Sequence, residues 1–355
     1  MGKKTQNHKK KHDVRIGRSI QRPCRAGRPL RVLLTCIGRR VSLVQCFRDA
    51  ARGPRLKVEL IGTDTTHLSA ALQCCDVQCQ VYPTDHPGYI RQLIRLVEKY
   101  GVDLIVPTVD LDLLLLAQAR DRFEQLGCRV LVSPEECIQI CQDKRKTYRF
   151  LTKHGFGCPV TASVSSVLNR KGVGRYLRFP CYLKPWDGYA SKGNAIVRNR
   201  RELAFYAKRI PHAICQEYIL GRELTCDVYV DLQGQVRCVV PRQRLEVRAG
   251  EVSKARVVME TRVINEVTRL VQSLEAGPGV VTVQLIVTEQ GDLHFIEINP
   301  RFGGGVPLSI AAGAHFPRWI LREVTGKPLI TTSLSIQDGL TMLRYDAEVW
   351  LKQEC

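Results

Sequence analysis

The sequence lacks the features of a membrane or secreted protein. It contains no run of about 18 apolar residues, the length needed to cross a bilayer. Its longest apolar stretch, around Leu113–Ala117, is far too short for this. The first thirty residues are basic and polar without an apolar segment, and Gln6 stands where a myristoylation motif requires Ser or Thr. These absences predict a cytoplasmic protein without a membrane span.

Acidic residues are scarce. The chain has 34 Asp and Glu against 54 Lys and Arg, for a formal net charge of +20. Residues 1–31 hold eleven of these cations and one acid, Asp13, and almost no apolar residues. We therefore expect residues 1–30 to form a disordered basic tail, because they cannot bury enough surface to offset the ordering entropy. Such a tail could contact nucleic acid or an anionic surface weakly. A solvated extension without that role is the alternative.

Cysteine is not scarce, but its arrangement does not indicate disulfides. There are 15 cysteines, an odd number, and no secretion signal, which favours reduced thiols. The group Cys74, Cys75 and Cys79 lacks the paired two-residue spacing of a zinc site. Packing is the simpler interpretation of these three, and a metal or redox role stays open.

The order of predicted elements divides the chain into two regions. Short β-rich runs alternate with helical patterns over residues 31–135, which predicts a doubly wound parallel sheet of the α/β class. From residue 136 to residue 345 the chain is rich in strands joined by Gly-containing turns, which predicts an α+β region with antiparallel sheets. The segment Pro241–Glu251 is expected to be a loop ending in glycine.

The strongest chemical signal lies at the end of a predicted strand, in Glu297-Ile298-Asn299-Pro300-Arg301. Alternation along a strand places Glu297 and Asn299 on one face, where their oxygens could hold a hard cation. Gln284, on the partner strand of the same hairpin, could supply a third oxygen. Arg301 could bind a transferred phosphoryl group through its planar donors. A polar strand end with a Gly-rich turn is the alternative.

Two further segments suggest a nucleotide. Lys184 ends a predicted strand and precedes a Gly/Ser loop, a pattern typical of a phosphate clamp, although the P-loop motif is absent. Cys215–Glu223 is a strand that leads into a linker and an acid, which could contact an adenine edge and a ribose. Alone, each segment is equally typical of an ordinary surface turn or strand end.

The conjunction and order of these segments resemble the ATP-grasp superfamily, with Asp143-Lys144 as its upstream lysine. The resemblance covers about Arg31 to Tyr345. It looks closest to stand-alone proteins similar to one synthetase half of the carbamoyl-phosphate synthase large subunit. Four stretches carry this closer resemblance: Leu33–Arg40, Pro107–Asp110, Val247–Glu251 and Asn299–Gly305.

The resemblance implies a pre-ATP-grasp domain over 31–135 and an ATP-grasp domain over 136–345, with ATP between a small lobe (about 151–218) and a large lobe (about 219–345). It implies the following nucleotide-binding residues: Lys144, Lys184, Ser191, Gln216, Tyr218, Ile219 and Glu223. Magnesium, or manganese in its place, would be bound by Gln284, Glu297 and Asn299. Arg301 and Lys184 would act in catalysis, and the loop that contains Ser191 would close over the triphosphate.

The implied reaction is the activation of a small-molecule carboxylate as an acyl phosphate, followed by attack of an amine, with release of ADP and phosphate. Phosphorylation of bicarbonate, as in carbamoyl-phosphate synthase, is one alternative. A non-catalytic nucleotide-binding protein with a nucleic-acid-binding tail is another. Relatives of this kind often form homodimers, so a homodimer is possible.

The segment Pro241–Glu251 is unusually basic and lies between the predicted adenine and magnesium regions. Arg244 and Arg248 could recognise an anionic substrate, since Arg binds carboxylates through two hydrogen bonds. A solvated basic hairpin is the alternative.

Overall fold

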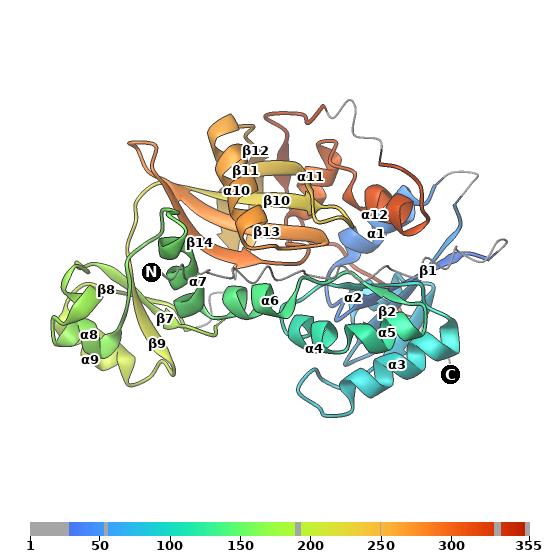
Figure 1. The fold of residues 1–355 in the computed structure, drawn as a ribbon, viewed down its shortest axis with the longest axis horizontal. Helices are drawn as coiled ribbons and strands as arrows, with labels where there is room; N and C mark the ends of the chain where they lie inside the picture. Colours follow the sequence, from blue (N-terminus) through green and yellow to red (C-terminus); the bar gives the residue numbers. More distant parts are fainter. Residues whose placement is uncertain (1–27, 53–55, 189–192, 249, 330–334, 352–355) are drawn as a thin grey trace, which may run out of the picture.

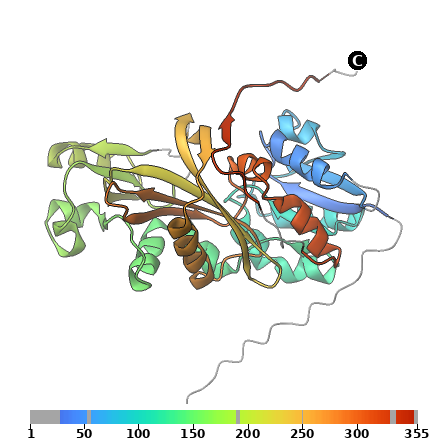
Figure 2. The ribbon, with the colours of Figure 1, turned by 90° about the horizontal axis from the view of Figure 1, so that it is seen from above.

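The computed structural model describes residues 28–52, 56–188, 193–248, 250–329 and 335–351. The expected basic tail therefore falls almost wholly outside the described residues, as does Ser191. Three parts follow one another along the long axis: an α/β domain at one end, a small lobe at the other, and a large antiparallel sheet between them (Figures 1 and 2). Among the described residues no helix is both long and apolar enough to cross a membrane.

The N-terminal part is a five-stranded parallel sheet with strand order β3-β2-β1-β4-β5. Its strands are β1 (Leu30–Thr35), β2 (Val58–Asp64), β3 (Val77–Gln80), β4 (Leu104–Pro107) and β5 (Arg129–Val130). Its helices are α1 (Val41–Ala50), α2 (Ala70–Gln73), α3 (Tyr89–Tyr100), α4 (Leu113–Gln118) and α5 (Arg120–Gln125). The predicted doubly wound parallel sheet is confirmed, and the strand order reverses between β1 and β4.

The small lobe is a four-stranded antiparallel sheet with the order β6-β9-β7-β8. Two helices, α6 (Glu135–Gln142) and α7 (Lys144–Lys153), lead into it. The lobe comprises β6 (Thr161–Ser163), α8 (Val164–Leu168), the short 3-10 helix η1 (Gly172–Arg175), β7 (Cys181–Pro185), β8 (Ala195–Val197), α9 (Arg200–Ala207) and β9 (Ala213–Glu217). One face of this sheet packs on α8 and α9 through buried apolar side chains.

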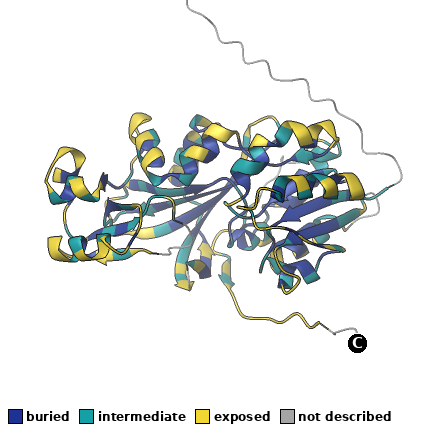
Figure 3. Cartoon of the chain, turned by 90° about the horizontal axis from the view of Figure 1, so that it is seen from below, coloured by how far each residue is buried: buried dark blue, intermediate teal, exposed yellow. Residues whose placement is uncertain are grey.

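The large lobe is built on a six-stranded antiparallel sheet with the order β14-β13-β10-β11-β12-β15. Its strands are β10 (Arg222–Val230), β11 (Val236–Arg248), β12 (Glu251–Val257), β13 (Gly279–Val287), β14 (Leu293–Asn299) and β15 (Thr341–Leu343). Its helices are α10 (Thr261–Ser273), α11 (Val306–Ala311) and α12 (Phe316–Val324). Strands of all three sheets are largely buried, whereas the helices expose their outer faces (Figure 3). The predicted antiparallel region is confirmed.

One expected loop is a strand. β11 continues through Pro241 to Arg248 and pairs with β12 in a hairpin, so the loop expected over Pro241–Glu251 is wrong. The reason is that Arg242 is buried in the sheet and its charge is satisfied there by an ion pair with Asp227, Nε to Oδ2 2.8 Å. The basic segment suggests a solvated loop in the sequence because Asp227, the acidic partner of Arg242, lies 15 residues away in the chain.

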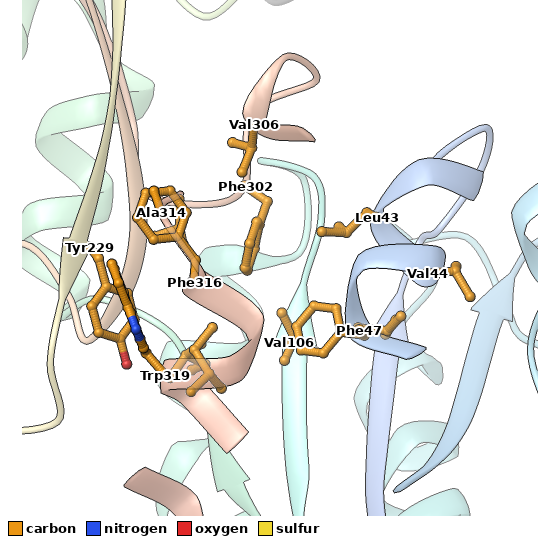
Figure 4. Packing of buried hydrophobic residues seen from close by; sticks show 14 of the residues in the cluster. Leu43, Val44, Phe47, Val106, Tyr229, Phe302, Val306, Ala314, Phe316 and Trp319 are labelled. Atoms are coloured by element: carbon orange, nitrogen blue, oxygen red, sulfur yellow. The ribbon is translucent and has the colours of Figure 1, made fainter. Parts of the chain in front are cut away.

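A shared apolar core joins the N-terminal domain to the large lobe (Figure 4). Phe47 of α1 packs on Phe302, which follows β14, with 5.9 Å between ring centroids. Leu43 and Val306 extend the contact, and Phe47 and Phe302 are each at most 1% exposed. This core holds the start of α1 and the carboxyl ends of β1 and β4 close to the end of β14.

We predict that Phe47→Ala lowers the free energy of unfolding by about 3–5 kcal/mol, because it removes a buried ring and leaves a cavity between domains. Urea unfolding followed by circular dichroism would measure this loss. Phe205→Ala is the matched control, since Phe205 is 51% exposed, and we expect it to cost roughly 0.5 kcal/mol or less. Equal losses in the two variants would contradict the role given to the shared core.

Candidate active site

The hairpin β13–β14 brings three oxygen-bearing side chains together. Gln284 lies directly opposite Glu297 in the register, and Asn299 lies two residues further along β14, opposite Thr282. Neighbouring strands place opposed side chains about 5 Å apart. Gln284, Glu297 and Asn299 all line a cavity of about 280 Å³. The sequence-based prediction that these residues share one face of the hairpin agrees with this placement.

These oxygens are available to a ligand from outside the protein. In the described part of the chain the side chains of Glu297 and Asn299 make no hydrogen bond or ion pair, and Gln284 accepts only a long contact from Arg244, 3.5 Å. Asn299 is nonetheless buried. Buried polar groups are normally paired, so this set fits a hard cation held by one carboxylate and two amide oxygens.

Thiols do not provide a competing metal site within the described ranges. No group of three or more His, Cys, Asp or Glu side chains there could hold a metal ion. Cys75 and Cys79 are buried, and burial raises the pKa of the Cys75 thiol to about 12. Cys75 packs against the N-terminal sheet with the apolar side chains of the shared core.

Arg301 links this oxygen cluster to the N-terminal domain. Its backbone N–H donates to the Asn299 carbonyl at 2.8 Å, which fixes the turn after β14. Its guanidinium forms an ion pair with Asp110, Nη2 to Oδ2 2.6 Å. Asp110 follows β4, and both side chains line the cavity. A cation and a carboxylate from different domains therefore meet beside the three oxygens.

The turn that follows requires glycine because it lies directly on polar side chains. A Cβ at Gly303 would lie 2.7 Å from the Thr282 hydroxyl oxygen, and one at Gly305 would lie 2.4 Å from Nη1 of Arg242. The turn thus lies against the buried pair of Arg242 and Asp227. A side chain at Gly303 would displace Thr282, and one at Gly305 would displace the guanidinium of Arg242.

Two lysines lie near each other at the small lobe, and one of them, Lys184, is within electrostatic range of Glu297. The amine of Lys144, at the start of α7, donates to the Gly188 carbonyl at 2.5 Å. The pKa of Lys184, on β7, is lowered to about 8, first by burial and then by the positive charge of Lys144, while Glu297 acts in the opposite direction. Lys184 therefore lies within electrostatic range of both Lys144 and Glu297.

The residues expected around the adenine lie on the face of the small sheet that is turned away from its core. Leu183 and Cys215 point into the core, so Tyr182, Lys184 and Gln216 share the opposite face. Gln216 is buried and its amide donates to the Thr161 hydroxyl at 3.0 Å.

The linker to the large lobe begins directly after Gln216 and Glu217. The Tyr218 ring lies 5.2 Å from that of Tyr182, centroid to centroid, and Ile219 is half-buried beside it in the chain. The pKa of Tyr182 is raised by burial, then by Tyr218 and Glu223. The structure thus brings Tyr218 and Glu223 to one place between the lobes.

Of the two arginines predicted to contact substrate, the structure brings one to the cavity. Arg244 lines it and forms an ion pair with Glu223, Nη1 to Oε1 2.5 Å. Arg248 does not line it: its side chain is 76% exposed and pairs with Glu246. Two register irregularities between Arg244 and Val247 rotate the end of the hairpin away from the face that alternation predicts.

Sequence reasoning missed several residues that line the cavity, among them Arg40, Asp110 and Glu251. Arg40 and Asp110 follow β1 and β4, the two strands at which the order of the parallel sheet reverses. Ligands of doubly wound sheets bind at this reversal point, outside the carboxyl ends of the strands. That rule would have singled out both residues once the strand order was known.

Two family models match this chain. A model described as an ATP-grasp domain matches residues 141–305, and one described as a PylC-like N-terminal domain matches residues 32–131. The carbamoyl phosphate synthase large chain of Thermoanaerobacter sp. is 25% identical over 242 residues, which cover 63% of this chain and 21% of that protein. The chain thus spans about a fifth of the length of this relative.

Solved structures show the same fold. The biotin carboxylase domain of the Hydrogenobacter thermophilus 2-oxoglutarate carboxylase, in complex with MgADP and bicarbonate, superposes with a TM-score of 0.68 at 17% identity, over 88% of this chain and 74% of that one. The L-amino acid ligase from Bacillus licheniformis gives 0.67 at 20% identity, over 88% and 79%. Residues 32–131 of this chain thus match a PylC-like N-terminal domain and residues 141–305 match an ATP-grasp domain, and the solved structures share the fold.

Proposed function

We propose that this protein is an ATP- and magnesium-dependent ligase that joins a small-molecule carboxylate to an amine and releases ADP. The observation that carries the proposal is the otherwise unpartnered oxygen cluster of Gln284, Glu297 and Asn299, which lines one cavity together with Arg301. Lys184 of the other lobe lies within electrostatic range of Glu297. Oxygen ligands on one side and ammonium groups on the other suit a metal-bound triphosphate. The ATP-grasp fold and its MgADP-bound neighbour support the same assignment.

The nucleotide would lie between the small sheet and the large sheet. Gln216, Tyr218 and Ile219 would contact the adenine, and Glu223, held by Arg244, would accept from the ribose hydroxyls. Lys144 and Lys184 would bind the phosphates, together with Ser191, which lies outside the described residues. Magnesium bound by Gln284, Glu297 and Asn299 would neutralise charge on the triphosphate.

The reaction would proceed in two displacements. A carboxylate oxygen of the first substrate attacks the γ-phosphorus, the bond to the β,γ-bridging oxygen breaks, and ADP leaves with that electron pair. The amine nitrogen then attacks the acyl carbon, phosphate leaves, and the nitrogen loses a proton. Arg301, held by Asp110 beside the oxygen cluster, would stabilise the charge on the transferred group. The chain's part is positioning and electrostatic stabilisation.

The solved structures include both an L-amino acid ligase and a biotin carboxylase domain bound to bicarbonate, so the choice between the two chemistries rests on experiment. The carbamoyl phosphate synthase relatives are matched over only a fifth of their length. ADP release that requires an organic acid and an amine would support the ligase, and release with bicarbonate alone would support the alternative. A neighbouring structure is a dimer, and a homodimer of this chain is part of the proposal. Nothing in the comparisons supports nucleic-acid binding by the tail.

We predict that the purified protein releases ADP and phosphate, not AMP, from ATP and magnesium when amino acids are supplied singly and in pairs. Glu297→Gln should lower this rate about 100-fold or more, because it removes the only carboxylate of the oxygen cluster. Coupled phosphate release and nucleotide chromatography would measure both. Glu289→Gln, at the exposed turn of the same hairpin, is the matched control and should keep the wild-type rate. No release from any pair, with Glu297→Gln unchanged, would contradict the proposal.

We also predict that affinity for MgADP falls as the pH rises from 7.5 to 9.5. The pKa of Lys184 in the free protein is about 8, so its ammonium is present below this pH and is lost above it. The nucleotide phosphates stay ionised over this range, so the loss is due to the lysine and approaches tenfold per pH unit. Isothermal titration at several pH values would measure it. The Lys184→Arg variant keeps its positive charge over this range, so its affinity for MgADP should change little with pH. The same pH dependence of affinity in the wild type and the variant would contradict the assignment of Lys184 to the phosphates.

A further inference from the structure

One arginine at the cavity beside the oxygen cluster has no carboxylate partner among the described residues. Four of the arginines in or around the cavity have carboxylate partners: Arg242 with Asp227, Arg244 with Glu223, Arg301 with Asp110, and Arg344 with Glu251. Arg40 also lines the cavity. Among the residues that the structure describes, its guanidinium has no hydrogen bond and no ion pair.

Arg40 is held at the cavity by a rigid support. Its backbone N–H donates to the Ile37 carbonyl at 3.0 Å, and its own carbonyl accepts from Leu43 at 2.9 Å and Val44 at 3.2 Å, so it forms the first turn of α1. That helix is fixed by Phe47, which packs on Phe302 directly before the glycine turn (Figure 4). The position of Arg40 relative to the oxygen cluster therefore depends on the shared core and not on a free loop.

The surroundings of Arg40 do not neutralise it. Its pKa is lowered to about 10, first by burial and then by the positive charge of Arg301, so the side chain remains a cation near pH 7. The carboxylates of Asp110 and Glu251 act in the opposite direction, but each is already paired with another arginine. A half-buried cation without a partner costs free energy that a bound anion would recover.

We propose that Arg40 binds a non-reacting carboxylate of a substrate, with the reacting end of that substrate beside Glu297 and Arg301. A cavity of about 280 Å³ suits a small metabolite. Arg binds a carboxylate through two parallel hydrogen bonds, which fixes direction as well as charge. This inference rests on the proposed function, because it takes the cavity as the substrate chamber of the ligase.

Two kinds of substrate carry such a group. It is either a second carboxylate of the acid that is activated, as in a dicarboxylic acid, or the carboxylate of an amino acid that acts as the amine. Three pairs of compounds separate these sources, since each pair differs only by the change of one carboxylate to an amide. They are succinate and succinamate, L-glutamate and L-glutamine, and L-alanine and L-alaninamide.

The test is isothermal titration of each compound into the full-length protein with MgADP present. The wild type should bind the acid of at least one pair at least about tenfold more tightly than its amide. Arg40→Ala should abolish that preference, Arg40→Lys should restore part of it, and Arg39→Ala, at the exposed neighbouring position, should leave it unchanged. A preference for succinate and for L-glutamate over their amides identifies the activated acid as the source of the carboxylate that Arg40 binds. A preference for L-alanine over L-alaninamide alone identifies the amine substrate as its source.

The proposal is overturned if no pair is discriminated by the wild type, or if Arg40→Ala keeps the wild-type preference. Affinity for MgADP, measured on the same variants, should not change, because Arg40 lies outside the proposed nucleotide contacts. The melting temperature should not fall, because the Arg40 guanidinium has no hydrogen bond or ion pair to lose among the described residues. If the wild-type protein does not bind MgADP, the proposed function is contradicted, whether or not the carboxylate compounds bind. The two failures are therefore distinguishable.

Discussion

The buried ion pair between Arg242 and Asp227 is the constraint on which the site depends. Both side chains are at most 2% exposed, and Asp227 also accepts from Ser309 at the start of the C-terminal helices and from Thr282 on β13. Removing one partner of such a pair typically costs about 3–5 kcal/mol, because the other charge is left buried and unpaired. The pair thus ties together three strands (β10, β11 and β13), one helix and the glycine turn next to the oxygen cluster.

This arrangement explains why residues far apart in the chain act as one site. The glycine turn approaches Arg242 so closely that its path admits little variation. Directly before this turn, Phe302 enters the core under α1 and brings the ends of β1 and β4 to the cavity. Arg301, between β14 and Phe302, meets Asp110 across the domain boundary. Strand, arginine, core aromatic and glycine turn follow one another along the chain, and this order places the contact between the domains next to the oxygen cluster.

The fold class and the oxygen cluster were predictable from the sequence because both depend on local patterns. Alternation along β14 places Glu297 and Asn299 together, and the hairpin turn at Gly291 brings Gln284 opposite. Long-range pairing was not predictable. The strand character of Pro241–Arg248 depends on Asp227, and the irregular register that turns Arg248 outward leaves no trace in composition. The short edge strand β3, with Gln78 and Gln80 exposed, also lacks an apolar pattern.

The two ends of the cavity differ in how they are built, and this bears on specificity. The oxygen cluster and Arg301 lie on or next to paired strands, whose geometry is fixed by the sheet and the buried ion pair. Arg40 and Asp110 lie instead where strands of the parallel sheet end, in connections that can change without disturbing the strands. In the proposed ligase, the antiparallel sheet would support the chemistry that requires fixed distances, while recognition of the rest of the substrate would depend on the N-terminal domain. A change of substrate would then require new residues after β1 and β4 and no change in the phosphoryl-transfer apparatus.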